Sequence, residues 1–124
     1  MTFIEVNPKI FQKDVEKKIK VLNDKINMLY EQVLNDIIAA GNRDRLFHKK
    51  LNLSREDALE ILKNDHHPDD VICEHICVYT TNLQFEINKI SELEKLSTVV
   101  KYCVNNENKH YLYVSKEELL TVLT

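Results

Sequence analysis

Glycine and proline are scarce in this chain of 124 residues, which contains one glycine, two prolines and no tryptophan. All-β folds need glycine in their tight turns, and a phosphate-binding loop needs several glycines in a short stretch. The composition therefore excludes such a loop and predicts long helices joined by few turns. No apolar run approaches the roughly 20 residues of a membrane-spanning helix, so we expect no contact with a membrane.

Cysteine is also sparse, and its three positions, Cys73, Cys77 and Cys103, are an odd number. The first residues lack the basic and apolar regions of a secretion signal. Together these features favour reduced thiols and a cytoplasmic protein. The abundance of Lys, Asn and Ile beside so little glycine is typical of AT-rich genomes, including those of phages and mobile elements.

Acidic charge is concentrated in the middle of the chain. Residues 54–94 contain ten acidic and three basic side chains, a net charge of −7, whereas residues 1–53 carry +3 and residues 95–124 carry +1. Nucleic-acid binding usually needs a basic surface, so this distribution argues against a nucleic-acid partner. An acidic middle is most simply a solvated face, and it is also available to a basic protein partner.

A heptad pattern is the strongest positive feature. Apolar residues recur at alternating steps of four and three, which predicts one side of a single long helix. Asn7-Pro8 is typical of a helix start, and Gly41 predicts a left-handed residue that ends the helix. We therefore expect a helix over residues 7–40. The heptad residues are Val15, Ile19, Leu22, Ile26, Leu29 and Val33.

Two further helices are expected in the middle of the chain. Ser54, with Asp57 three residues later, predicts the cap of a short helix over residues 54–64. Pro68 and the two acids that follow it are typical of another helix start, and an apolar helical stripe continues from there over residues 68–97. The β-branched residues of this stretch leave a strand open as the alternative, but its length favours the helix.

The C-terminal part predicts β structure followed by a helix. Residues 98–104 and 109–114 are rich in strand-forming residues and are separated by asparagines, which indicates a β-hairpin over residues 98–114. Ser115 with Glu118 predicts a capped helix over residues 115–123. The expected fold class is mainly α (α+β) in one domain, residues 1–124. A long N-terminal helix packs on a second long helix, and a short bridging helix, a hairpin and a terminal helix complete it.

The long helix also raises the question of self-association. Its β-branched and leucine positions are typical of parallel dimers, but its flanking residues offer no complementary ion pairs and its stripe widens, which favours packing on the helix over residues 68–97. A helix about 50 Å long still exposes apolar surface, so we expect a homodimer to which it contributes. The candidates for that surface are Phe11, Val21, Met28 and Leu34.

A basic stretch follows the long helix and offers further interaction residues, namely Arg43, Arg45, Lys49 and Lys50. Short helix, longer helix and hairpin is the element order of a winged-helix DNA-binding protein, in which these side chains would contact phosphates. Against this alternative, the helix that would read the bases begins with Asp69 and Asp70. It also lacks Arg, Asn or Gln near its start for base readout.

Metal and catalytic chemistry have little support. On a helix, Cys73 and Cys77 are one turn apart and could share an ion with His67, so these three are weak metal candidates. No Cys-x-x-Cys pair is present, and cysteines on apolar faces commonly act as small hydrophobic residues, as we expect for Cys103. No serine lies in the strand-to-helix turn of a hydrolase. We therefore expect no metal, no cofactor and no enzymatic activity.

These features together favour a small, non-enzymatic, protein-binding module. Inhibitors, immunity proteins and phage or mobile-element anti-defence proteins share this size and act by binding a protein partner. The alternative is a winged-helix transcriptional regulator. The sequence identifies neither the partner nor the pathway.

Overall fold

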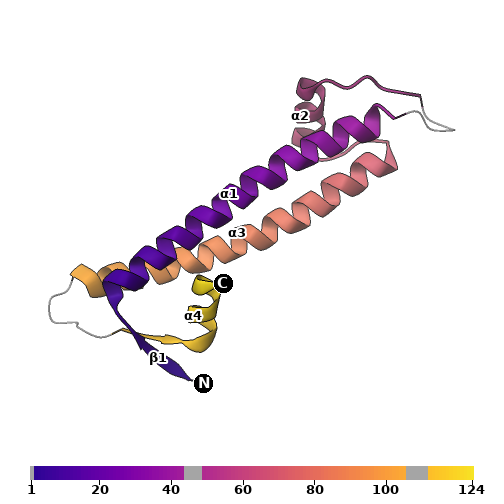
Figure 1. Cartoon of the computed structure of the whole chain (residues 1–124). Coiled ribbons are helices and arrows are strands. Elements are labelled where there is room, and N and C mark those ends of the chain that lie inside the picture. Colours follow the sequence, from indigo (N-terminus) through magenta and orange to yellow (C-terminus); the bar gives the residue numbers. More distant parts are fainter. Residues whose placement is uncertain (1, 44–48, 106–111) are drawn as a thin grey trace. The chain divides into compact units, whose positions relative to one another are not determined.

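The structure of the chain is a computed structural model that describes residues 2–43, 49–105 and 112–124. The chain divides into two compact units, and the two long helices contribute one half to each (Figure 1). Unit 1 comprises Met1–Asp24 and Glu86–Thr124, and unit 2 comprises Lys25–Phe85. In chain order the elements are β1 (Phe3–Val6), α1 (Pro8–Gly41), α2 (Arg55–Asn64), α3 (Asp70–Asn105), β2 (Leu112–Ser115) and α4 (Lys116–Leu123).

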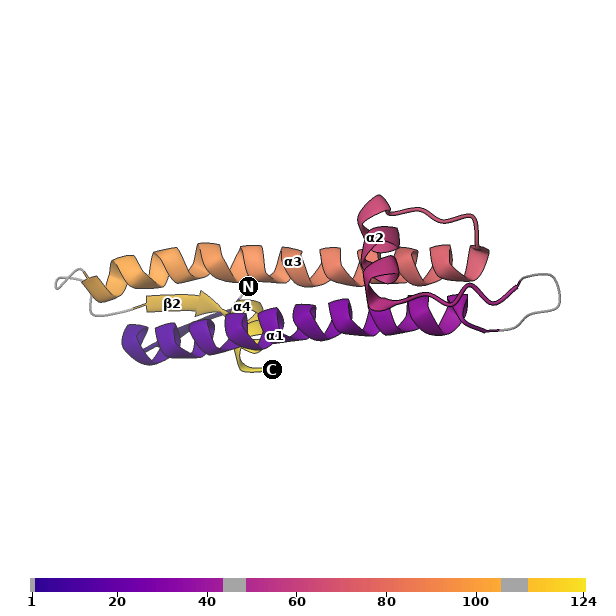
Figure 2. The same ribbon diagram turned by 90° about the horizontal axis from the view of Figure 1, so that it is seen from above.

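The fold class predicted from the sequence, mainly α with a small β component, is confirmed. In each unit, the local segments of α1 and α3 run antiparallel and side by side (Figure 2). The long helix expected over residues 7–40 is α1, the bridging helix over residues 54–64 is α2, and the terminal helix over residues 115–123 is α4. None of the helices in the described ranges has the length and apolar character that a membrane span requires.

Helix α1 begins and packs as its sequence indicates. The Asn7 side-chain oxygen accepts hydrogen bonds from the backbone N–H groups of Lys9 at 3.0 Å and Ile10 at 3.2 Å, so Asn7 caps the helix. All six residues of the predicted heptad pattern are buried or half-buried. The apolar side of α1 therefore packs within its own chain, as the widened stripe indicated.

The expected left-handed conformation of Gly41 is wrong. No glycine in the described residues has a positive φ, and the helical hydrogen bonding continues to Asn42, whose N–H donates to the Ile38 carbonyl at 2.9 Å. The small size of Gly41 matters instead, because a Cβ there would overlap the Leu53 side chain, with 3.0 Å to its Cγ. Gly41 thus leaves room for the chain that returns over the end of α1.

The core of unit 2 is formed by α1, α2 and α3. Ser54 caps α2 through a capping box with Asp57, as predicted, and Asp65 ends the helix in the left-handed conformation with φ of 56°. Between these caps, α2 contributes buried Ala58 to the core, and half-buried Leu59, Ile61 and Leu62 pack against it. The buried residues of this core are Val33, Leu34, Ile37, Ala40, Ala58, Ile72 and Ile76.

Helix α3 settles the open choice between helix and strand for residues 68–97. The Asp69 carboxylate accepts hydrogen bonds from the N–H groups of Val71 at 2.9 Å and Ile72 at 3.3 Å, so it caps the helix. Inside the helix, the hydroxyl of Thr80 donates to the Ile76 carbonyl at 2.9 Å. Such bonds allow threonine to sit in a helix in spite of its preference for strands.

The hairpin expected over residues 98–114 is corrected by the structure. Residues 98–105 are the last turns of α3, because the three- and four-residue spacing of Leu93, Ser97 and Val100, all buried, outweighs the strand preference of the valines. An antiparallel two-stranded sheet followed by a helix is present, but its strands are β1 and β2, with Ile4 opposite Val114. The expected asparagine turn at residues 106–108 lies outside the described residues.

In unit 1, the two-stranded sheet leads directly into α4, which lies beside the local segments of α1 and α3. Ser115 is the last residue of β2 and the cap of α4: its hydroxyl accepts from the Glu118 N–H at 3.1 Å and donates to the Glu118 carboxylate at 3.0 Å. The chain therefore turns from strand to helix with no intervening loop. Buried residues of unit 1 come from α1, α3, β2 and α4, and include Phe11, Val15, Leu22, Ile90, Leu93, Val100, Leu112, Val114 and Val122.

Candidate functional site

A groove between α3 and α4 in unit 1 is the candidate site, and we call it the acidic groove. It has a volume of about 330 Å³. Buried Leu93 and half-buried Leu96 give it an apolar floor. Three glutamates and one lysine line the groove, and all four are exposed. Its complete lining is Glu92, Leu93, Lys95, Leu96, Glu117, Glu118 and Thr121.

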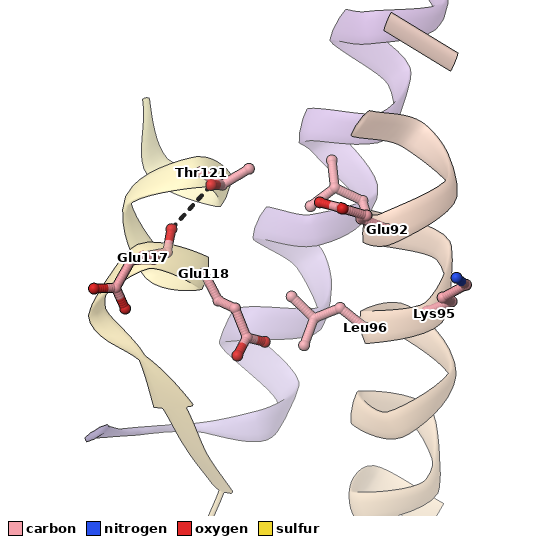
Figure 3. A pocket seen from close by; sticks show the side chains of 7 residues that line it. Glu92, Lys95, Leu96, Glu117, Glu118 and Thr121 are labelled. Carbon is pink, nitrogen blue, oxygen red and sulfur yellow. Dashed lines mark hydrogen bonds between the residues drawn. The ribbon is translucent and has the colours of Figure 1, made fainter. Parts of the chain in front are cut away.

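The side chains of the acidic groove converge from two helices. In Figure 3, Glu92 and Leu96 on α3 and Glu118 on α4 point toward one another, whereas Glu117 and Lys95 lie on the outer sides of their helices. Glu92 and Leu96 are four residues apart, which places them on the same side of a helix. The Ser115 hydroxyl holds the Glu118 carboxylate at 3.0 Å. The groove therefore combines an apolar floor with fixed negative charge at its rim.

A second groove lies on the other side of α4, against α1, and we call it the basic groove. It has a volume of about 230 Å³. Lys17 and Lys18 of α1 line it together with one acid, Asp14. Val21 and Leu123, which are 50% and 60% exposed, add apolar surface on its two sides. Helix α4 therefore separates a groove of negative charge from a groove of positive charge.

The three weak metal candidates, His67, Cys73 and Cys77, lie near the start of α3. The Cys73 thiol lies within hydrogen-bond distance of the backbone of His67, and the His67 Nδ1 accepts from the Asp69 N–H at 3.0 Å. Cys77 is exposed. These contacts shape the chain just before α3, and the described residues contain no group of three or more His, Cys, Asp or Glu side chains placed to hold a metal ion.

The four apolar interaction candidates divide into two pairs. Val21 and Met28 are exposed, and Val21 lines the basic groove. Phe11 and Leu34 lie in the cores of unit 1 and unit 2, so they are not part of an exposed surface. Phe11 precedes buried Val15 by four residues, so the two lie on the same side of α1 although Phe11 is off the heptad pattern.

The basic candidates after α1 that the structure describes belong to unit 2. Arg43, Lys49 and Lys50 are exposed, and Arg45 lies outside the described residues. Arg43 lines a hollow in unit 2 beside Asp36 and His75. The hairpin that would form the wing of a DNA-binding domain is not formed by residues 98–114, since β2 pairs with β1.

Sequence reasoning did not identify the residues of the acidic groove. The sequence indicated Glu118 only as part of a capping box, and Glu92 and Leu96 only as helix-forming residues. The available signal was the four-residue spacing of Glu92 and Leu96, which mixes charge with an apolar residue on one side of α3. Nothing local indicates that α4 folds against that side.

Comparison with known proteins gives no match: no family model, no curated protein and no solved structure matches this chain. The function therefore rests on the chain's own residues. Among the described residues, the acidic groove best combines shape, apolar surface and a net negative charge.

Proposed function

We propose that this protein is a non-enzymatic, protein-binding module and that its acidic groove holds a segment of a protein partner. The apolar floor between Glu92 and Glu118 supports this proposal, because an amphipathic segment can bury an apolar side chain there and place cations at the rim. A segment carrying leucine or isoleucine next to Lys or Arg has the required chemistry.

The two parts of the groove contribute differently to binding. Exposed ion pairs are each worth about 0–1 kcal/mol, so the glutamates mainly select the partner and speed its approach. Most of the affinity comes from covering Leu93 and Leu96. A groove of this size holds one or two side chains, so a single segment binds weakly and the full partner adds contacts elsewhere.

This mode of action is the one used by small inhibitors, immunity proteins and phage or mobile-element anti-defence proteins, which we propose as the class. Such proteins act by covering a surface of their target. A cytoplasmic location and a cytoplasmic partner belong to the same proposal, and the identity of that partner lies beyond it.

Selection from a displayed library of helical peptides tests the proposal. The chain is expected to enrich peptides that carry Lys or Arg beside an apolar residue, with binding that weakens as salt rises. Leu96→Gln makes the floor polar and is expected to remove the enrichment. Glu92→Lys leaves two glutamates and two lysines in the lining and is expected to remove the preference for cations.

Glu94→Lys is the matched control for Glu92→Lys. Glu94 is exposed, does not line the groove and lies about 200° around α3 from Glu92, so its reversal makes the same change in net charge away from the site. If Leu96→Gln enriches the same peptides as the native chain, or Glu94→Lys behaves like Glu92→Lys, the acidic groove is not the binding site.

A further inference from the structure

The two grooves of unit 1 have complementary charges within one chain. Glu92, Glu117 and Glu118 outweigh Lys95 in the acidic groove, whereas Lys17 and Lys18 outweigh Asp14 in the basic groove. On the same segment of α1, exposed Lys13 and Lys20 outnumber exposed Glu16, so the segment keeps a net positive charge. The chain therefore carries both a negatively charged receptor surface and a basic helix with an exposed apolar residue, Val21.

Exposed leucines of α4 lie between the two grooves. Val122 is buried, and Leu120 lies about 200° away from it around the helix, so Leu120 occupies the outer crest of α4 at 49% exposure. Leu123 lies on the side of the crest nearest the basic groove. The crest has apolar leucine at Leu120 and exposed Lys116 four residues earlier on the same side. Flanked by two oppositely charged grooves, it is a self-complementary surface.

We propose that the partner segment of the acidic groove is the basic α1 surface of a second copy of this chain, in a dimer centred on α4. This inference rests on the proposed function of the acidic groove and names its occupant. Two observations support a second copy as the partner. The two α4 crests can make apolar contact, and grooves of opposite charge lie on both sides of each crest.

Symmetry selects one arrangement of the dimer. A two-fold axis parallel to α4 and lying in the interface exchanges the two sides of the crest, so each acidic groove faces the basic groove of the partner copy. A two-fold axis across α4 would place acidic groove on acidic groove, and like charges would oppose it. The parallel axis also brings Leu120 against Leu120 of the partner copy.

The size of the surface sets the expected strength. Stable interfaces bury about 800 Å² on each partner, and an eight-residue helix with its two flanking grooves lies at the small end of that range. The dimer is therefore expected to dissociate in the micromolar range and to weaken as salt rises.

Sedimentation equilibrium of the full chain from low to several hundred micromolar tests the dimer. The mass is expected to rise from 14.6 kDa toward twice that value. Leu120→Glu is expected to hold the chain at the monomer mass, because it places a charge on each side of the two-fold axis. Circular dichroism confirms that this exposed position has not altered the fold.

Exchanging the charges of the acidic and basic grooves tests whether the two-fold axis is parallel to α4. Glu92→Lys and Lys17→Glu are each expected to weaken self-association about tenfold, which is about 1.4 kcal/mol. An equimolar mixture of the two variants is expected to associate as strongly as the native chain, because the parallel axis gives each mixed dimer two attractive sides. Glu94→Lys, away from both grooves, is expected to leave the association unchanged.

Two results would overturn the dimer. One is a monomer at every concentration; the other is a dimer whose strength Leu120→Glu and the charge exchange leave unaltered. Peptide selection separates this failure from failure of the proposed function. A monomer whose groove still enriches basic peptides, and loses them in Leu96→Gln, overturns only the dimer, whereas loss of both readouts overturns the groove itself.

Discussion

Units 1 and 2 use the same pair of helices but cover it differently. In unit 2, α2 lies against α1 and α3, and the side chains that meet there form one closed core around Leu34 and Ile37. In unit 1, the cover is a two-stranded sheet and the eight-residue α4, with a groove on each side of that helix. The core of unit 2 stabilises the chain, whereas unit 1 leaves a groove on each side of its covering helix.

Side-chain hydrogen bonds also hold the covering segments of unit 2 more firmly than those of unit 1. In unit 2, the Asn42 amide hydrogen-bonds both backbone groups of Leu53, and Arg55 donates to both oxygens of Glu31. Helix α4 in unit 1 is fixed at its start by Ser115 and has few residues to bury. An isolated helix of this length is unstable in water, so α4 is expected to open more easily than α2.

Leu34→Ala is expected to have the largest effect on stability. Leu34 is completely buried in the core of unit 2, and truncation leaves a cavity that costs about 2–5 kcal/mol. Thermal and urea unfolding measure the loss. Asn35→Ala, at the adjacent exposed position, is the control and is expected to change little. A loss below about 1 kcal/mol for Leu34→Ala would mean that the core of unit 2 is not closed.

Val122→Ala is expected to act locally in unit 1. The side chain is 5% exposed and anchors α4, so its truncation costs about 2 kcal/mol, at the low end for core truncations. Hydrogen exchange is expected to accelerate in α4 while α2 keeps its protection. Leu123→Ala, at a 60% exposed position of the same helix, serves as the control when measured in dilute solution. Equal acceleration in α2 and α4 would show that the two units open together.

The sequence predicts those parts of the fold that depend on residues close together in the chain. Asn7, Ser54 and Ser115 each cap the helix that the sequence indicated, because a cap depends on residues within one turn. The strand partner of β2 was missed because β1 is distant in sequence, and pairing over that separation leaves no local signal. The alternation of Phe3–Val6 was the only hint of β1.

The acidic groove was not predictable for the same physical reason. It exists because Ser115 turns the chain directly from β2 into α4, and because β1 holds β2 in place. Neither contact follows from the residues that line the groove. The basic groove differs in one residue, because Val21 lies off the heptad pattern and was predicted as exposed surface.

Gly41→Ala tests how tightly unit 2 is closed. Alanine favours a helix by up to about 1 kcal/mol over glycine, but its Cβ would overlap Leu53, whose backbone Asn42 holds in place. Such overpacking costs about 1–3 kcal/mol, so the variant is expected to be about 1 kcal/mol less stable. The double variant with Leu53→Ala separates the two effects: on that background, Gly41→Ala is expected to stabilise. A stabilising single variant would mean that Leu53 moves aside freely.

Arg55→Ala is expected to have the smallest effect on stability and a clear effect on one pKa. The hydrogen bonds from the Arg55 guanidinium, at 2.7 and 2.9 Å, lower the pKa of Glu31 below its ordinary value. A lowered pKa in the folded state means that the pair stabilises the protein above the unfolded pKa and that this contribution disappears as pH falls through the folded pKa. Both groups are about half exposed, so solvent screens the pair and little stability is lost at neutral pH. NMR titration of Glu31 is expected to show its pKa rising toward the ordinary value in the variant. An unchanged Glu31 pKa would mean that α2 is not held against α1 by this pair, and that burial of Ala58 and its neighbours alone closes unit 2.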